Sequence, residues 1–125
     1  MPNLYLLHHP EKGRCVHCAE DIPKGALIEI CPLIILSKEE AELIHKTHLH
    51  DYYFLWNEKT GSVAIALGYG SLYNHSSTPN AETESVFETN ELRILATKDI
   101  AAGEEITFDY QGEVKDTDIW FDVVL

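Results

Sequence analysis

Turn-forming residues recur along this chain at short intervals, and they limit what it can fold into. His9–Gly13, Ile22–Gly25, Asn57–Gly61 and Ala101–Glu104 each carry the Pro, Gly or Asn residues that favour tight turns. The segments between them are short, and several alternate polar with apolar residues, as half-buried strands do. We therefore predict a mostly β (α+β) fold of short strands with one short helix.

The expected strands share this alternation or a compact apolar run. They are Leu4–His8, Arg14–Ala19, Ala26–Ile30, Leu33–Leu36, Tyr52–Trp56, Ser62–Leu67, Ala81–Phe87, Glu91–Ala96 and Glu105–Asp109. Pro32 has no backbone N–H for a sheet ladder, so we expect a bulge or an edge position there. Gly68–Tyr73 is too rich in glycine for a strand and is expected to form a turn, and Asn74–Asn80 is expected to be a polar loop.

One helix is expected after the fourth strand. Ser37 followed by Glu40 makes a capping box, in which each side chain satisfies a backbone N–H of the other residue. Ala41, Leu43 and Ile44 then give an apolar stripe at helical spacing. We predict that the helix continues to about residue 48.

Length and composition fit a single domain over residues 1–125. Hydrophobic residues make up 45% and charged residues 24% of the chain, which excludes a low-complexity or disordered protein. No apolar run, Leu33–Leu36 included, approaches the ~20 residues that span a bilayer. Met1–His8 lacks the basic start of a secretory signal. We expect a cytoplasmic protein without a membrane partner.

The net charge limits the classes of molecule that this protein is expected to bind. Nine basic residues against 21 acidic ones give a net charge of −12. Phosphate-rich surfaces would be repelled, so we expect no direct contact with nucleic acid. A basic protein or peptide would be attracted, although the charge could equally serve only solubility.

The cysteines offer a metal-like spacing that we interpret as structural. Cys15 and Cys18 flank a histidine in a C-x2-C pattern, but a closed zinc site needs four ligands and Cys31 is the only other thiol. Within a strand, Cys15 and Cys18 would also point to opposite faces. We predict buried cysteines and no metal site.

Two segments carry the strongest functional signal. They are Gly68–Asn80 (GYGSLYNHSSTPN) and Gly103–Tyr110 (GEEITFDY). They resemble, in order and spacing, the signature motifs of SET-domain protein lysine methyltransferases, N-H-S-x-x-P-N and E-[IL]-x-[FI]-x-Y. Lys12–Arg14 and Ile22–Gly25 match a third, looser family motif. The resemblance covers about residues 4–112, and the length is similar to that of small viral histone methyltransferases.

The resemblance implies a fold of several short curved sheets with a knot-like C-terminal segment. It implies S-adenosylmethionine as cofactor and transfer of its methyl group to a lysine of a basic protein, such as a histone tail. By resemblance, Tyr110 is the catalytic residue. The implied cofactor contacts are Gly13, Arg14, Asn74, His75 and Trp120, and the implied lysine channel is lined by Tyr52, Tyr69 and Tyr73.

Two departures from the family pattern affect these expectations. Cys15 stands where the family has the second glycine of its N-terminal loop, and no cysteine-rich zinc module follows the second motif. We therefore expect residues 113–125, with Trp120 and Phe121, to cover the cofactor or to form a homodimer contact. A non-catalytic peptide-binding or assembly module is the alternative function, and a nuclear location is the alternative to the cytoplasm.

Overall fold

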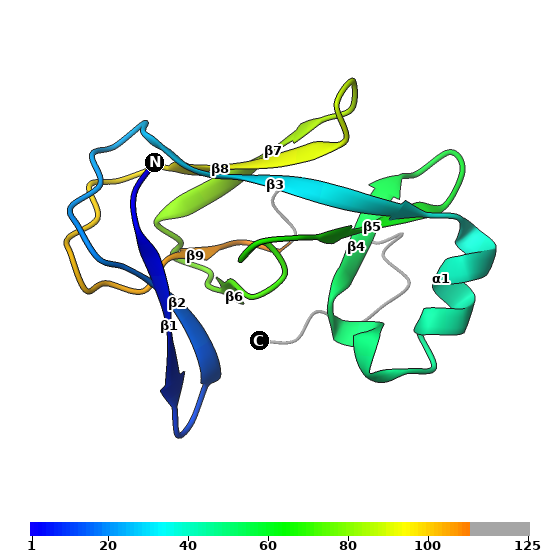
Figure 1. Ribbon diagram of the computed structural model, residues 1–125, viewed down its shortest axis with the longest axis horizontal. Coiled ribbons are helices and arrows are strands. Elements are labelled where there is room, and N and C mark those ends of the chain that lie inside the picture. The colour runs from blue at the N-terminus through cyan, green and yellow to red at the C-terminus, as the bar shows by residue number, and fades with distance from the viewer. Residues whose placement is uncertain (111–125) are drawn as a thin grey trace.

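The computed structural model describes residues 1–110 of the chain and contains three small β-sheets and one α-helix (Figure 1). The elements in chain order are β1 (Leu4–His9), β2 (Gly13–Cys18), β3 (Leu27–Leu36), α1 (Lys38–Ile44), the 3-10 turn η1 (His48–Asp51), β4 (Tyr53–Asn57), β5 (Ser62–Ala66), β6 (Asn74–His75), β7 (Ala81–Val86), β8 (Glu91–Ala96) and β9 (Thr107–Phe108). This confirms the predicted mostly β fold with one short helix.

The sheets surround the pair formed by β6 and β9. The hairpin β1–β2 is one sheet, a five-stranded sheet has the order β4-β5-β3-β8-β7, and β6 pairs with β9 in parallel. Figure 1 shows β6 and β9 between the hairpin on one side and β4, β5 and α1 on the other. Residues from distant parts of the chain can therefore meet at this pair.

Pro32 lies in the central strand of the large sheet, so the expectation of an edge or bulge there was wrong. The reason is that β3 changes partner at this residue: β3 pairs with β8 up to Pro32 and with β5 from Leu33 onward. The missing N–H of Pro32 falls at the end of one ladder, where it costs little. Its carbonyl still accepts a hydrogen bond from the backbone N–H of Leu67 at 2.9 Å.

The helix starts as predicted but ends earlier. Ser37 caps α1, and both hydrogen bonds of the capping box with Glu40 are present. The helix ends at Ile44 because Thr47 adopts an extended backbone, and its hydroxyl donates to the carbonyl of Ile44 and accepts from the N–H of Leu49. Leu43, which we expected in the apolar stripe, is 68% exposed.

The main core is formed by side chains from all three sheets. Its fully buried side chains include Val16, Ile28, Tyr73, Ile94 and Ile106. All three cysteines are buried, as predicted. No helix within residues 1–110 has the length and apolarity to cross a membrane.

Several expectations concern the end of the chain. Residues 113–125, with Trp120, lie outside the described residues. The last described strand, β9, is shorter than the strand predicted over Glu105–Asp109, because its partner β6 offers only two residues for pairing.

Candidate active site

The parallel pairing of β6 with β9 brings the two sequence motifs side by side. Asn74 pairs with Thr107 and His75 with Phe108, whereas the sequence of the first motif predicts only a polar loop. Asn80 fastens the pair, because its side-chain amide donates to the carbonyl of Glu105 at 2.8 Å and its oxygen accepts from the N–H of Thr107 at 2.9 Å. The structure therefore joins the segments whose spacing singled them out.

Tyr110, at the end of the second motif, is held by residues of the first. Its backbone N–H donates to Nδ1 of His75 at 3.1 Å, and its hydroxyl donates to the backbone carbonyl of Tyr73. The rings of Tyr110 and His75 meet edge to face with centroids 5.3 Å apart, and Phe108 packs at 5.8 Å. These contacts fix both the position and the orientation of the half-buried phenol ring.

The phenol of Tyr110 is neutral at physiological pH. Burial raises its pKa to about 12, and the nearby carboxylate of Glu105 adds to that effect. Because the hydroxyl proton is directed at the Tyr73 carbonyl, the lone pairs of the phenol oxygen remain as hydrogen-bond acceptors.

Asn74 ties the first motif to the β1–β2 hairpin. Its side-chain nitrogen lies 3.0 Å from the carbonyl oxygen of Arg14, 3.2 Å from Sγ of Cys15 and 2.8 Å from Oε2 of Glu105. The amide donates across 60 residues of sequence, which joins the hairpin loop to the motif pair. These contacts position the hairpin loop against the motif pair.

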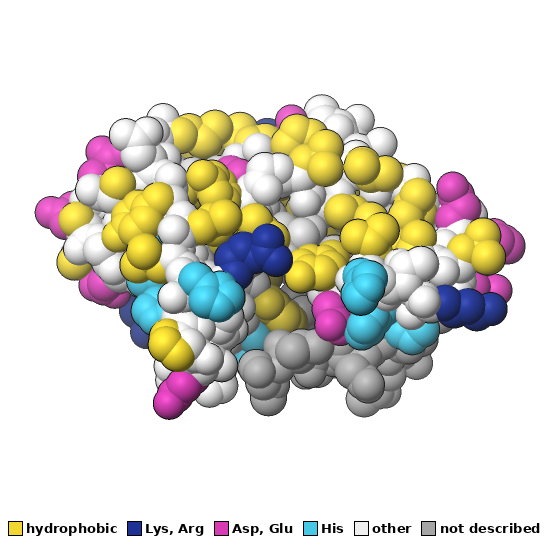
Figure 2. All heavy atoms as spheres, turned by 60° about the horizontal axis from the view of Figure 1, so that its bottom comes forward, with side chains coloured by type: hydrophobic (Ala, Val, Ile, Leu, Met, Phe, Trp, Pro, Cys, Tyr) yellow, Lys and Arg dark blue, Asp and Glu magenta, His cyan; other side chains and the backbone are white. Residues whose placement is uncertain are grey.

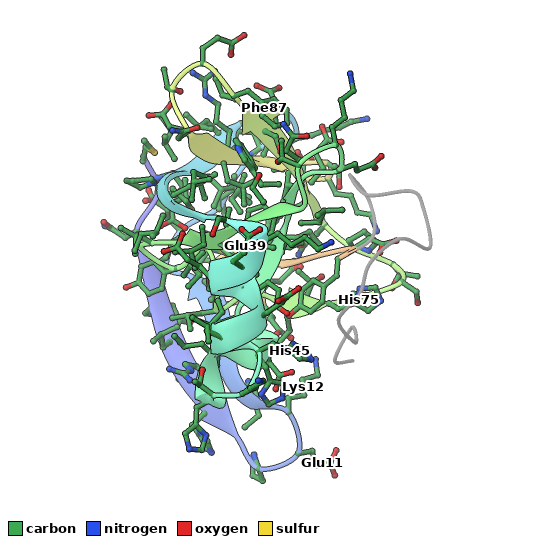
Figure 3. All side chains as sticks on the ribbon, turned by 90° about the vertical axis from the view of Figure 1, so that its right-hand side faces the viewer. Glu11, Lys12, Glu39, His45, His75 and Phe87 are labelled. Atoms are coloured by element: carbon green, nitrogen blue, oxygen red, sulfur yellow. The ribbon has the colours of Figure 1, made fainter. Side chains whose placement is uncertain are left out.

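Glu105 is the central acceptor of this network. Burial alone would raise the pKa of its carboxyl, but hydrogen bonds from Lys12 and Asn74 outweigh burial and lower the pKa. The Lys12 ammonium lies 2.8 Å from Oε1 of Glu105. In Figure 3, Lys12 lies at the tip of the β1–β2 hairpin, and His75 belongs to β6. Phe87 lies at the opposite end of the molecule.

The start of β2 also contacts Tyr52, the residue that follows η1. Gly13 has a φ of +78°, which favours glycine, and a Cβ added there would meet no atom within 4 Å. The next residue, Arg14, is exposed and donates from Nη2 to the hydroxyl of Tyr52 at 3.3 Å. Tyr52 also contributes to the raised pKa of Tyr110, as expected for neighbouring groups. The predicted residues Gly13, Arg14, Tyr52 and Tyr110 therefore lie in one region.

Tyr69 and Tyr73, predicted as channel walls, both donate hydrogen bonds to the half-buried carboxylate of Glu29. Tyr73 is 1% exposed, and its hydroxyl donates to Oε1 of Glu29 at 2.7 Å. The N–H of Tyr69 donates to Oε2 of Glu29 at 3.0 Å, and its hydroxyl reaches the carbonyl of Leu4 at 3.4 Å. Gly68 permits this approach, because a Cβ there would lie 2.4 Å from Oε2 of Glu29.

Three polar residues whose hydrogen bonds hold this site together were not predicted from the sequence, although the sequence offers a signal for two of them. Glu105 is the acidic first position of the second motif, and Glu29 interrupts an otherwise apolar strand face with Leu27 and Cys31. Asn80 ends the first motif, but its bridging contacts depend on a pairing that the sequence does not reveal. Among the predicted cofactor contacts, Trp120 lies outside the described residues.

Comparison with known proteins agrees with this geometry. The family model described as "SET domain" matches residues 13–111. A Schizosaccharomyces pombe protein, "Histone-lysine N-methyltransferase, H3 lysine-37 specific", is 34% identical over 112 residues, covering 89% of this chain and 71% of its own length. "Histone-lysine N-methyltransferase Set2" of Drosophila melanogaster is 40% identical over 110 residues, but the match covers only 5% of that protein.

A solved structure supports the same conclusion. A Plasmodium falciparum protein, described as a candidate histone methyltransferase, superimposes with a TM-score of 0.68 at 29% identity, and the match covers 93% of this chain and 99% of the other. The fold, the paired motifs and these similarities confirm the expected resemblance. The chain belongs to the SET-domain family of protein lysine methyltransferases.

Proposed function

We propose that this protein transfers a methyl group from S-adenosylmethionine to a lysine side chain of a basic protein, with a histone tail as the first candidate substrate. The observation that carries this proposal is the setting of Tyr110. One motif supplies the phenol, and the other supplies the Tyr73 carbonyl and the His75 ring nitrogen that hold it.

The residues near the hairpin loop suit the cofactor. The exposed guanidinium of Arg14 can pair with a carboxylate, and the open space beside Gly13 lets a ligand approach the backbone. His75, whose side chain is 14% exposed, lies beside them on β6. Arg14, Gly13, Asn74 and His75 would hold the cofactor. When bound, S-adenosylmethionine supplies an electrophilic methyl group on a positively charged sulfur.

The protein's own contribution would be mainly positioning. Methyl transfer to nitrogen needs little acid–base chemistry, so alignment of the reacting groups accounts for much of the rate. Tyr110 would accept weak hydrogen bonds through its phenol oxygen, because its own proton is engaged with Tyr73. Tyr52 would line the approach of the lysine, whose ammonium is easier to deprotonate where aromatic side chains exclude water.

Charge supports a basic substrate. The net charge is −12, and Figure 2 shows hydrophobic side chains over the middle of one face with acidic side chains mostly toward its edges. Such a surface favours encounter with a lysine-rich segment. The histone-directed names of the relatives agree with this substrate class and favour the nuclear location over the cytoplasmic one.

The non-catalytic alternative rested on Cys15. The structure shows this residue fully buried, with its sulfur accepting a hydrogen bond from Asn74. The larger side chain is therefore part of the network that positions the site, which favours the catalytic function.

The test is transfer of a labelled methyl group from S-adenosylmethionine to mixed core histones by the full chain. We expect label on the histones and none on the same histones after their lysines have been chemically acetylated, because acetylation removes the amine nucleophile. Label that persists on acetylated histones would contradict lysine as the acceptor. Firm cofactor binding without transfer to any basic protein would favour the binding module.

A further inference from the structure

Three side chains that can bind metals meet on one face of the β1–β2 hairpin. They are His9, Cys15 and His17, and their ligand atoms all lie within 4.8 Å of one another. The strand register explains the meeting: His9 pairs with Gly13, Cys15 with Leu7 and His17 with Tyr5, so these odd-numbered positions share one side of the hairpin. None of the three was predicted to act on the substrate.

The two imidazoles already have the spacing of metal ligands. Nε2 of His9 and Nε2 of His17 are 3.2 Å apart. In a tetrahedral zinc site with ordinary Zn–N bonds, two ligand nitrogens stand about 3.3 Å apart. The rings stack with centroids 5.4 Å apart, and Tyr5 also stacks with His17, at 5.6 Å, which limits the movement of the pair.

A carbonyl group fixes the tautomer of His17. Its Nδ1 lies 2.9 Å from the backbone oxygen of Gly103, and a carbonyl oxygen can only accept a hydrogen bond. Nδ1 therefore carries the proton, and the lone pair of Nε2 faces His9. Histidines that bind metals usually donate their other ring N–H to such a partner. His17 is 6% exposed, so this arrangement is built into the interior.

Cys15 supplies a sulfur ligand, whereas Cys18 does not. The thiol of Cys18 donates to the carbonyl of Ala101 at 3.2 Å, away from the histidines, as the alternation of a strand requires. Two imidazoles and one thiol favour zinc and similar transition ions over magnesium or calcium, which prefer oxygen ligands. Three protein ligands also leave a fourth tetrahedral position for water.

We propose that His9, Cys15 and His17 form a binding site for one zinc-type divalent ion, with the fourth position left for a water molecule. This differs from the expectation of no metal site, because the sequence alone does not show that His9 meets Cys15 and His17 across the hairpin. Because Asn74 donates to the same sulfur, an ion on Cys15 competes with the contact that links the hairpin loop to the motif pair. Metal binding at this site therefore alters the region in which we place the cofactor, but the site itself does not depend on the proposed function.

The test is titration of the full, reduced chain with Co²⁺, followed by displacement with Zn²⁺. We expect one equivalent of Co²⁺, with the visible absorption of a tetrahedral ion and a thiolate-to-cobalt charge-transfer band. His9→Gln should weaken binding by about 100-fold or more, because a direct ligand is worth more than the outer partners that typically cost 10–100-fold. Cys15→Ser should remove the charge-transfer band.

His8→Gln is the matched control. His8 is the exposed neighbour of His9 on the other face of the same strand, so its loss should leave both affinity and spectrum unchanged. Circular dichroism establishes that each variant is folded. His45, His48 and His50 belong to the end of α1 and to η1 and not to the hairpin strands. Figure 2 shows histidine side chains in two separate groups on one face. Equal affinity in His9→Gln and the parent, or absence of the charge-transfer band in the parent, would overturn the proposal.

Discussion

At the residue scale, the candidate catalytic group is defined by its neighbours. Tyr110 makes backbone and side-chain hydrogen bonds to the first motif, and its ring packs on His75 and Phe108. The motifs predicted that Tyr110, Asn74 and His75 belong together. They could not predict that the Asn74 amide points to the hairpin, because that contact depends on folding across distant sequence.

Asn74→Ala should weaken S-adenosylmethionine binding by roughly tenfold, the effect of losing about 1–1.5 kcal/mol of hydrogen bonding. The substitution removes the amide that fixes the hairpin loop beside β6. Isothermal titration calorimetry measures the change, with the exposed Asn3→Ala as control. Unchanged affinity in a folded Asn74→Ala protein would mean that the cofactor binds elsewhere.

The raised pKa of Tyr110 predicts a loss of stability in alkali. The pKa is about 12 in the folded protein and about 10 in an unfolded chain. The neutral phenol therefore contributes stability that is fully present below about pH 10 and is lost as the pH rises toward 12. Tyr110→Phe has no group to ionise, so its free energy of unfolding should fall less steeply between about pH 9 and 11. Urea unfolding at both pH values tests this, and parallel decreases would contradict it.

At the element scale, the sequence predicted most strands but not how they assemble into sheets. The alternating segments and the capping box of α1 are local signals, and the structure confirms them. The place of Pro32 in a central strand depends on a change of partner between β8 and β5, which no local pattern reveals. The parallel pairing of β6 with β9 was also hidden, because two-residue strands carry no periodicity.

Asn80→Ala tests the importance of that pairing for the fold. The variant loses two partly buried hydrogen bonds, to Glu105 and Thr107, so the free energy of unfolding should fall by about 2 kcal/mol. Asn80→Asp keeps an acceptor for the Thr107 N–H and should recover part of the loss. Equal stability of Asn80→Ala and the parent in urea would show that the side chain does not fasten the pair.

At the scale of the whole molecule, the excess of acidic residues predicts salt-sensitive recognition. Attraction between a surface of net charge −12 and a lysine-rich substrate weakens as salt screens it. The KM for a histone-tail peptide should therefore rise several-fold between low and moderate salt, while kcat changes little. A peptide with the same target lysine but neutral flanking residues serves as control, and an equal salt effect on both peptides would argue against electrostatic attraction.

The most direct test of the account compares Tyr110→Phe with the parent in methyl transfer and in cofactor binding. The substitution removes one oxygen and keeps the ring, so we expect kcat to fall by ~10²–10³ while the Kd for S-adenosylmethionine stays nearly constant. Tyr53→Phe is the matched control, because it removes a buried phenol hydroxyl that contacts His45 away from the site. Calorimetry and a labelled-methyl assay give the two quantities. Equal turnover by folded Tyr110→Phe and the parent would contradict the central role of Tyr110.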